Sequence, residues 1–224
     1  MKLCHIFKNV IILLCLGSLL VACSGGETAP KTALPHLDNT MPGGNLTFTH
    51  KLDGNRFAVT SRFSTTYNTS QWRVTDSKTI DLQLTESSSV PVTVLVEHVH
   101  IDISLKSTLA LFDGWSQDSA DFKLSTGSEP GVLVSSQYPY ENVMAVEGFS
   151  QTMMSAWTYY TDSYAVTDVE QKRLTEDNLV REGGVYANKI QIIWFLLVQY
   201  PDESHYHAEV MTDEFVIPVA NAQS

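Results

Sequence analysis

The sequence predicts a mainly β protein: an antiparallel β-sandwich, immunoglobulin-like or similar, with one or two short helices. From Asn45 onward, apolar and polar residues mostly alternate, which is the pattern of half-buried strands. Asp53-Gly54 separates two such runs, and this pair is a strong hairpin signal. The candidate strands are many and short while helical periodicity is scarce, a combination typical of β-sandwiches.

The first strands are indicated by alternation and by β-branched residues. Phe57, Val59 and Ser61, for example, fall on one face of the second strand, because successive side chains point to opposite faces. Strands are expected over residues 46–52, 56–63, 80–85, 91–105, 132–134 and 143–146.

The last two strands are expected to form a hairpin. Residues 189–200 contain the apolar run 192–198, which is too short to cross a membrane, so we predict a central strand buried on both faces. Pro201 ends this strand, and a short turn leads to a final strand over residues 206–219.

Helical signals are confined to the region before the last hairpin. Residues 167–170, Thr-Asp-Val-Glu, resemble a capping box, and Gly183-Gly184 could end the helix that follows. We therefore expect a helix over about residues 168–181. The segment 149–157 is ambiguous between helix and strand.

The N-terminus resembles a bacterial lipoprotein signal peptide. Lys2 and Lys8 precede an apolar run from Val10 to Leu20, and the ending Leu20-Val21-Ala22-Cys23 resembles a lipobox. The resemblance implies that residues 1–22 are removed and that Cys23 is lipidated, with palmitate as an expected chain. It also implies a membrane-anchored, extracytoplasmic protein of the cell envelope. Ser24 favours the outer membrane, facing the periplasm, in an organism with two membranes.

Two alternatives to the lipobox remain open. A retained membrane helix is disfavoured because the apolar run falls short of the roughly 20 residues that a span needs. An ordinary secretory signal, with Cys23 incidental, is the other alternative.

The chain is expected to divide into three parts. Residues 1–22 are expected to be the signal peptide. The Gly and Pro content of residues 23–44 predicts a flexible tether without a packed element, which begins at the lipidated cysteine. Residues 45–224 are long enough for a single domain with its own core.

Cysteine and charge content narrow the function classes. The 3 cysteines are Cys4, Cys15 and Cys23, so the domain has no thiol for a disulfide or a cysteine metal site. The net charge of -11 argues against nucleic acid and against direct adsorption to anionic lipid. Divalent cations and cationic partners are compatible with this charge, and so is simple solubility outside the cell.

Two matched histidine motifs are the leading candidates for a metal site. Alternation puts the two histidines and the acid of each H-x-H-x-acid motif on one strand face. Imidazole and carboxylate are ligands that suit zinc, copper or iron. The alternatives are solvent-exposed histidines, or histidines that sense pH. A single site requires the two strands to be neighbours. The six residues are His98, His100, Asp102, His205, His207 and Glu209.

An acidic loop offers a weaker candidate, for calcium. Asp113, Asp118 and Asp121 lie close together in sequence with a glycine, and calcium takes clustered oxygen ligands. The spacing does not match an EF-hand loop, and a solvated turn explains it as well.

Aromatic residues in the middle of the chain are candidates for a partner or glycan surface, because exposed rings can stack on sugars or anchor a protein. Packing over one end of the sandwich is the alternative. The residues are Tyr138, Tyr140, Trp157, Tyr159 and Tyr160, with Tyr164 nearby.

Catalytic motifs are poorly represented. The chain has no G-x-S-x-G elbow, S-x-x-K motif, P-loop or dinucleotide fingerprint. A triad of His98 or His100 with Asp102 and a serine is defined by geometry, so sequence alone does not exclude it.

These observations favour a non-enzymatic, lipid-anchored binding or envelope-interaction protein, with an envelope protein or glycan as partner. A zinc- or copper-binding lipoprotein is the alternative. A hydrolase of envelope glycan or polymer is a weaker one.

Overall fold

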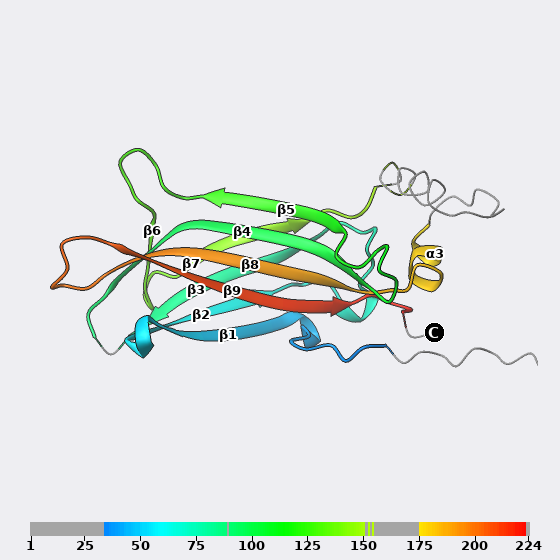
Figure 1. Ribbon diagram of the computed structural model, residues 1–224, viewed down its shortest axis with the longest axis horizontal. Helices are drawn as coiled ribbons and strands as arrows, with labels where there is room; N and C mark the ends of the chain where they lie inside the picture. The colour runs from blue at the N-terminus through cyan, green and yellow to red at the C-terminus, as the bar shows by residue number, and fades with distance from the viewer. Residues whose placement is uncertain (1–33, 89, 151, 153, 155–174, 223–224) are drawn as a thin grey trace, which may run out of the picture. The chain divides into compact units, whose positions relative to one another are not determined.

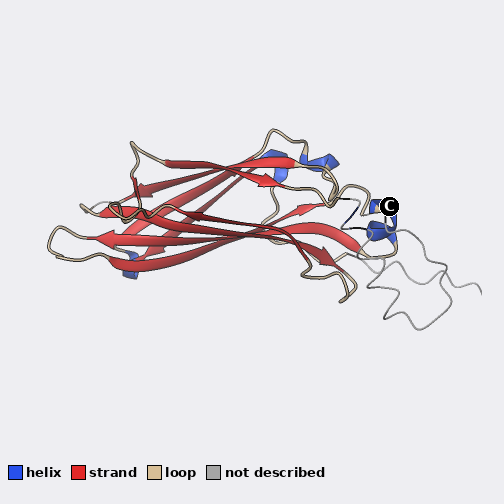
Figure 2. Ribbon diagram, turned by 90° about the horizontal axis from the view of Figure 1, so that it is seen from above, coloured by secondary structure: helices blue, strands red, loops and turns tan. Residues whose placement is uncertain are grey.

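The chain forms a two-layer β-sandwich in a computed structural model, which describes residues 34–88, 90–150, 152, 154 and 175–222. Two antiparallel sheets face each other, as the predicted fold class requires (Figures 1 and 2). Their facing sides carry the apolar residues of each alternating strand, and these form one continuous core.

The first sheet has four strands in the order β1-β2-β3-β7, each antiparallel to its neighbours. The expected hairpin at Asp53-Gly54 joins the first two strands through the 3-10 turn η2 (Asp53–Asn55). The strands are β1 (Asn45–Leu52), β2 (Phe57–Ser64), β3 (Lys78–Ser87) and β7 (Tyr140–Val146).

The second sheet has five strands in the order β5-β4-β8-β9, and β6 pairs with the other half of the long strand β4. The last two strands form the expected hairpin. The strands are β4 (Thr93–Ser107), β5 (Ser116–Lys123), β6 (Val132–Val134), β8 (Val185–Gln199) and β9 (His207–Pro218).

Strand β8 is central in its sheet, but the prediction that both of its faces are buried is wrong. The inward face is almost completely enclosed, and Trp194 is 0 % exposed. On the outward face Ile193, Phe195 and Leu197 are only partly covered, because no further layer packs over this side of the sheet among the described residues.

A buried carboxylate links the two sheets beside Trp194. Asp213 on β9 is 0 % exposed and accepts a hydrogen bond from Trp194 Nε1 at 2.8 Å. His50 Nε2, on β1 of the opposite sheet, donates to the other carboxylate oxygen at 2.6 Å. Buried charges cost several kcal/mol unless they are paired and hydrogen-bonded, so these two donors hold β1 against β9.

A second buried network ties β5, β8 and the segment after β2 together. Trp72 Nε1 donates to Asn188 Oδ1 at 2.8 Å, and Asn188 Nδ2 donates to Gln117 Oε1 at 2.7 Å. Gln117 in turn donates to the backbone oxygen of Glu147 at 2.9 Å. The network satisfies its amides without water, so it fixes the packing of these segments.

The expected tether extends too far toward the domain. Met41 is buried, its backbone nitrogen donates to Val216 O, and Val216 N donates to Asn39 O. Leu34 and Leu37 pack against a small apolar cluster on β8 and β9. Residues 39–44, including the 3-10 turn η1 (Pro42–Gly44), therefore belong to the folded unit. Residues 23–33 lie outside the described part of the chain.

Helix α3 (Glu176–Arg181) confirms the end of the expected helix. Thr175 and Asn178 cap it reciprocally, and Gly184 follows with a positive φ of 63°. Residues 168–174 and the capping box expected at 167–170 lie outside the described residues. In the ambiguous segment, Thr152 and Met154 are helical, and the other residues from 151 to 157 are not described. Among the described residues, no helix is long and apolar enough to cross a membrane.

We predict that Trp194→Ala lowers the free energy of unfolding by about 3–5 kcal/mol, as large core truncations do. The change removes a buried ring and leaves Asp213 without one of its two donors. Chemical denaturation measures the loss.

Phe195→Ala is the matched control, because it truncates the adjacent, partly exposed ring on the outward face and should cost only about 1–2 kcal/mol. A Trp194→Ala stability within about 0.5 kcal/mol of wild type would contradict the buried position.

Candidate functional sites

The two histidine motifs are not neighbours in the sheet. His98 and His100 lie on β4, whereas His207 and Glu209 lie on β9, and β8 runs between these strands. The motifs also point to opposite faces. His98 is opposite the outward-facing Phe195, while His207 is opposite the fully buried Val198. The prediction that all six residues form a single metal centre is therefore wrong.

The first motif forms a cluster on the outward face with a carboxylate from β5. Asp121 Oδ1 lies 2.5 Å from His98 Nε2 and 3.0 Å from His100 Nδ1. His100 Nε2 also lies 3.0 Å from Asp102 Oδ2. Both ring nitrogens of His100 thus face carboxylate acceptors, an arrangement that favours the doubly protonated imidazolium.

The electrostatics of this outward cluster follow from these contacts. The hydrogen bond to Asp121, followed by that to Asp102, raises the pKa of His100 above its ordinary value, although partial burial opposes the shift. Hydrogen bonds from His98 and then His100 hold the pKa of the Asp121 carboxyl below its usual range. The cluster therefore favours a positively charged His100 beside a negatively charged Asp121.

Apolar residues surround these histidines on the outward face, and we call them the outer strip. The strand register places them in adjacent rows, Leu133 opposite Leu95 and Leu95 opposite Leu197. The ring of Phe195 stacks on His98 at 4.9 Å between centroids. The outer strip consists of Leu95, Leu133, Ile193, Phe195, Leu197 and Val210, of which Leu95 is buried by its neighbours.

The second motif contributes to a different cluster at the end of the sandwich. One ligand atom each from Asp53, His207 and Glu209 lie within 4.8 Å of one another, and all three residues are partly buried. His205 is not part of it, because this residue lies in the exposed β8–β9 turn, where its Nδ1 is 2.7 Å from Ser204 Oγ. Sequence reasoning identified His207 and Glu209 but missed Asp53.

The turn η2 explains why Asp53 reaches this cluster. Asp53, Gly54 and Asn55 all have positive φ, of 46°, 64° and 72°, which these three residue types tolerate best. The tight left-handed turn brings the end of β1 over the start of β9, and Figure 1 shows both at the same end of the sandwich. The Asp-Gly pair predicts the turn, but it does not predict that the turn lies next to β9.

Tyr200 and Arg56 line the same place. The Arg56 guanidinium lies 3.5 Å from the centre of the Tyr200 ring, and its Nη1 is 3.1 Å from Asp53 Oδ2. Burial, and then the nearby Asp53 carboxylate, raise the pKa of Tyr200 to about 12. The phenol is therefore neutral at physiological pH.

The expected calcium loop is not formed by its three carboxylates. Asp113 accepts from Ser107 N and pairs with Lys106 at 3.1 Å. Asp118 accepts hydrogen bonds from backbone nitrogens, at 2.8 Å and 3.1 Å. Asp121 is instead engaged by the histidines, so each carboxylate has its own partners.

The aromatic surface is only partly described. Tyr138 is 67 % exposed, as a binding residue would be. Tyr140 is buried and meets Trp194 edge-on at 6.0 Å, so its assignment to a partner surface is wrong. Trp157, Tyr159, Tyr160 and Tyr164 lie outside the described residues.

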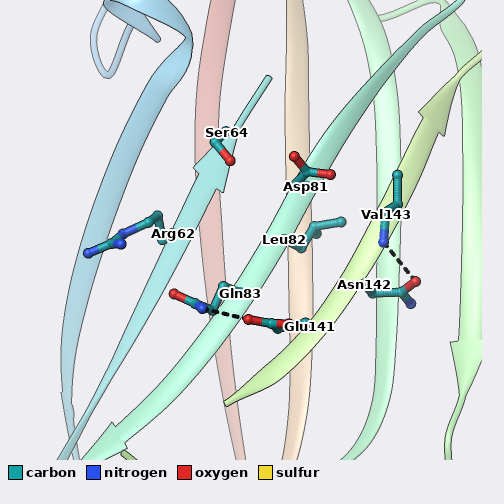
Figure 3. A pocket seen from close by; sticks show the side chains of 8 residues that line it. All are labelled: Arg62, Ser64, Asp81, Leu82, Gln83, Glu141, Asn142 and Val143. Atoms are coloured by element: carbon teal, nitrogen blue, oxygen red, sulfur yellow. Dashed lines mark hydrogen bonds between the residues drawn. The ribbon is translucent and has the colours of Figure 1, made fainter. Parts of the chain in front are cut away.

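The opposite sheet has a polar outward face with a shallow hollow over β2, β3 and β7 (Figure 3). Within it Gln83 Nε2 donates to Glu141 Oε1 at 2.9 Å, and Val143 N donates to Asn142 Oδ1 at 2.8 Å. Among the described residues that line the hollow, Arg62 is the one cation and none is a histidine. Its groups are those of an ordinary hydrated strand surface.

A buried lysine is a further perturbed group that sequence reasoning missed. Burial lowers the pKa of Lys78 to about 8. Its ammonium group donates to the backbone oxygens of Arg73 and Asp76 and lies 4.2 Å from the centre of the Trp72 ring. These contacts hold the lysine in the core, so we assign it a structural role.

Comparisons with known proteins leave the family open. No protein-family model and no curated protein matches the sequence. A solved structure of a Northeast Structural Genomics Consortium target, SoR45, is 8 % identical with a TM-score of 0.34, covering 76 % of this chain and 91 % of that one. A protein from Archaeoglobus fulgidus is 10 % identical with a TM-score of 0.29, covering 70 % and 93 %. At these scores neither likeness bears on function.

We predict that Asp121→Asn lowers the pKa of His100 toward its ordinary value, because the strongest charged acceptor is lost. NMR titration of the imidazole measures the shift. Asp118→Asn, on the same strand and with the same charge change, is the control and should move this pKa less.

The same pKa shift sets the sign of a stability effect. The pKa of His100 is higher in the folded state than in the unfolded state. The charged imidazole therefore stabilises the fold fully at pH values below its unfolded-state pKa of about 6.5, and this stabilisation is lost as pH rises through the folded-state pKa. His100→Gln should therefore be more destabilising, relative to wild type, at pH values below about 6 than above about 8. An equal destabilisation at both pH values would contradict the assigned charge state.

Proposed function

We propose that the protein is a lipid-anchored, extracytoplasmic binding protein without enzymatic activity. In this proposal Cys23 carries the anchor, and the outward face of the five-stranded sheet binds a protein partner in the cell envelope. The observation that carries the proposal is the outer strip beside His98 and His100.

The exposure of the outer strip supports a protein partner. Val210 is 53 % exposed and Leu133 is 51 % exposed, and the strand register makes them part of one apolar surface with the partly covered β8 residues. Soluble proteins rarely leave a contiguous apolar surface uncovered without an interaction to cover it. A flat strand face of this kind suits another protein better than it suits an enclosed small ligand.

The charges around the outer strip suggest the chemistry of the partner. Asp102 and Asp121 border the strip on one side. Glu214 lies on the outward face of β9 beyond Gln191, where Lys189 pairs with it at 2.8 Å. With a chain net charge of -11, this rim favours a partner that presents apolar side chains flanked by lysine or arginine.

We predict that Cys23→Ala abolishes acylation and leaves the protein unprocessed or free of the membrane. Membrane fractionation and mass spectrometry of the N-terminus test this. Ser24→Ala, which leaves the cysteine in place, is the control and should still be acylated. A Cys23→Ala protein that remains processed and acylated would show that the lipobox interpretation is wrong.

We predict that a photo-crosslinking amino acid at Val210 captures one discrete protein in intact cells. Val143 is the matched control position, because it is also 53 % exposed but lies on the outward face of the opposite sheet. The Val210 product should disappear with Phe195→Glu and should weaken with added salt, since the rim is charged.

Mass spectrometry of the product tests the nature of the partner. A protein whose crosslinked surface is apolar and basic is the expected result. Equal products at both positions, or a product that survives Phe195→Glu, would overturn the assignment of this face. A product that carries glycan instead of a second protein would overturn the protein partner.

A further inference from the structure

The cluster at the end of the sandwich has the composition of a metal site, separately from the outward binding face. Asp53, His207 and Glu209 supply two carboxylates and an imidazole, with one ligand atom of each within 4.8 Å of the others. Asp53 lies in the turn η2 between two strands of the four-stranded sheet, and the other two residues lie on β9 of the five-stranded sheet. The three groups therefore converge from both layers of the fold.

The strand register directs His207 and Glu209 inward rather than to solvent. His207 is opposite Val198 and Glu209 is opposite Leu196, and both partners are buried in the core. Paired residues of antiparallel strands share a face, so these two polar side chains enter the end of the sandwich. The intervening Ala208 and the following Val210 are exposed on the other face.

The contacts of the His207 ring suit a metal ligand. Its Nδ1 lies 3.3 Å from Glu203 Oε2, so this side of the ring faces a carboxylate. Its Nε2 is buried and has no hydrogen-bond partner among the described residues. Carboxylates that orient a ligating histidine in this way are the usual second layer around protein-bound zinc.

Among the described residues, the Tyr200 hydroxyl and the Glu209 carboxylate have no hydrogen bond of regular geometry. The Tyr200 hydroxyl is buried without a hydrogen bond of regular geometry, in a residue that is only 3 % exposed. The Tyr200 ring stacks on His207, with 6.0 Å between the centroids. None of the described residues gives the Glu209 carboxylate a hydrogen bond or an ion pair. A bound cation with its water would satisfy groups that are otherwise costly to bury.

We propose that Asp53, His207 and Glu209 form a binding site for one divalent transition-metal ion of the zinc class. The imidazole nitrogen disfavours calcium and magnesium, which take oxygen ligands, whereas zinc accepts this mixed set. Three protein ligands leave a coordination position for water. Arg56 pairs with Asp53 through Oδ2 and leaves the other oxygen to the ion.

Zinc titration of the full-length protein tests this site, in detergent, without a histidine tag and against a competing chromophoric chelator. Wild type should bind one zinc more per chain than His207→Ala. The near-isosteric variants Asp53→Asn and Glu209→Gln should weaken this zinc at least about tenfold, since even second-layer changes cost that much. Glu203→Gln should weaken it by about tenfold.

Three control variants separate this site from other histidines and from the binding face. His205→Ala removes the other histidine of the same motif, which lies in the exposed turn. His98→Ala removes a histidine of the outward cluster, and Phe195→Glu disrupts the outer strip. All three should retain the zinc, so a failure of the partner proposal and a failure of this one are distinguishable.

A thermal shift and a cobalt spectrum give readouts besides stoichiometry. Zinc should raise the melting temperature of wild type and not that of Glu209→Gln, with both proteins compared first in chelator to show that the variant is folded. Cobalt should give ligand-field bands without a thiolate charge-transfer band. Zinc binding that is absent from wild type, or that is lost in His98→Ala but kept in His207→Ala, would overturn the proposal.

Discussion

The buried carboxylate of Asp213 is the constraint on which the arrangement of both sheets depends. It is fully enclosed, and its two oxygens accept from Trp194 on β8 and from His50 on the opposite sheet. A carboxylate in this position needs both donors, since leaving a buried charge short of a partner costs several kcal/mol. The edge strand β1 is therefore held beside β9, and the turn at its end is carried over His207 and Glu209.

Strand β9 then serves two surfaces through simple alternation. Its inward positions continue from Asp213 toward Glu209 and His207, where the carboxylates and the imidazole converge with Asp53. Its outward positions, such as Val210, join the outer strip beside His98 and Phe195. Because successive residues point to opposite faces, one strand can contribute to the proposed cation site and to the proposed partner surface independently.

The failures of sequence reasoning at particular residues have a common cause. Tyr140 was expected on a partner surface because it lies in a stretch rich in aromatic residues. It is buried instead, because β7 pairs with β3 and turns this ring toward Trp194. Met41 lies in a Gly- and Pro-rich stretch that reads as linker, yet its backbone bonds to Val216, far away in sequence. Asp121 was expected to be a calcium ligand in an acidic loop, and its carboxylate instead accepts from two histidines of β4. Each outcome depends on a contact with a residue far away in sequence, which the local sequence pattern does not predict.

The sequence by itself determined the strand periodicity, the hairpins at Asp53-Gly54 and before β9, and the shared strand face of His98 and His100. These follow from local geometry, since side-chain alternation and turn conformation depend on a few adjacent residues. Only the tertiary structure decided that β8 separates the two histidine motifs, so that His98 and His207 serve different faces. Strand order depends on how well the apolar faces of all the strands pack in the core. This packing energy is the sum of many contacts between distant segments, so no single segment of the sequence predicts it.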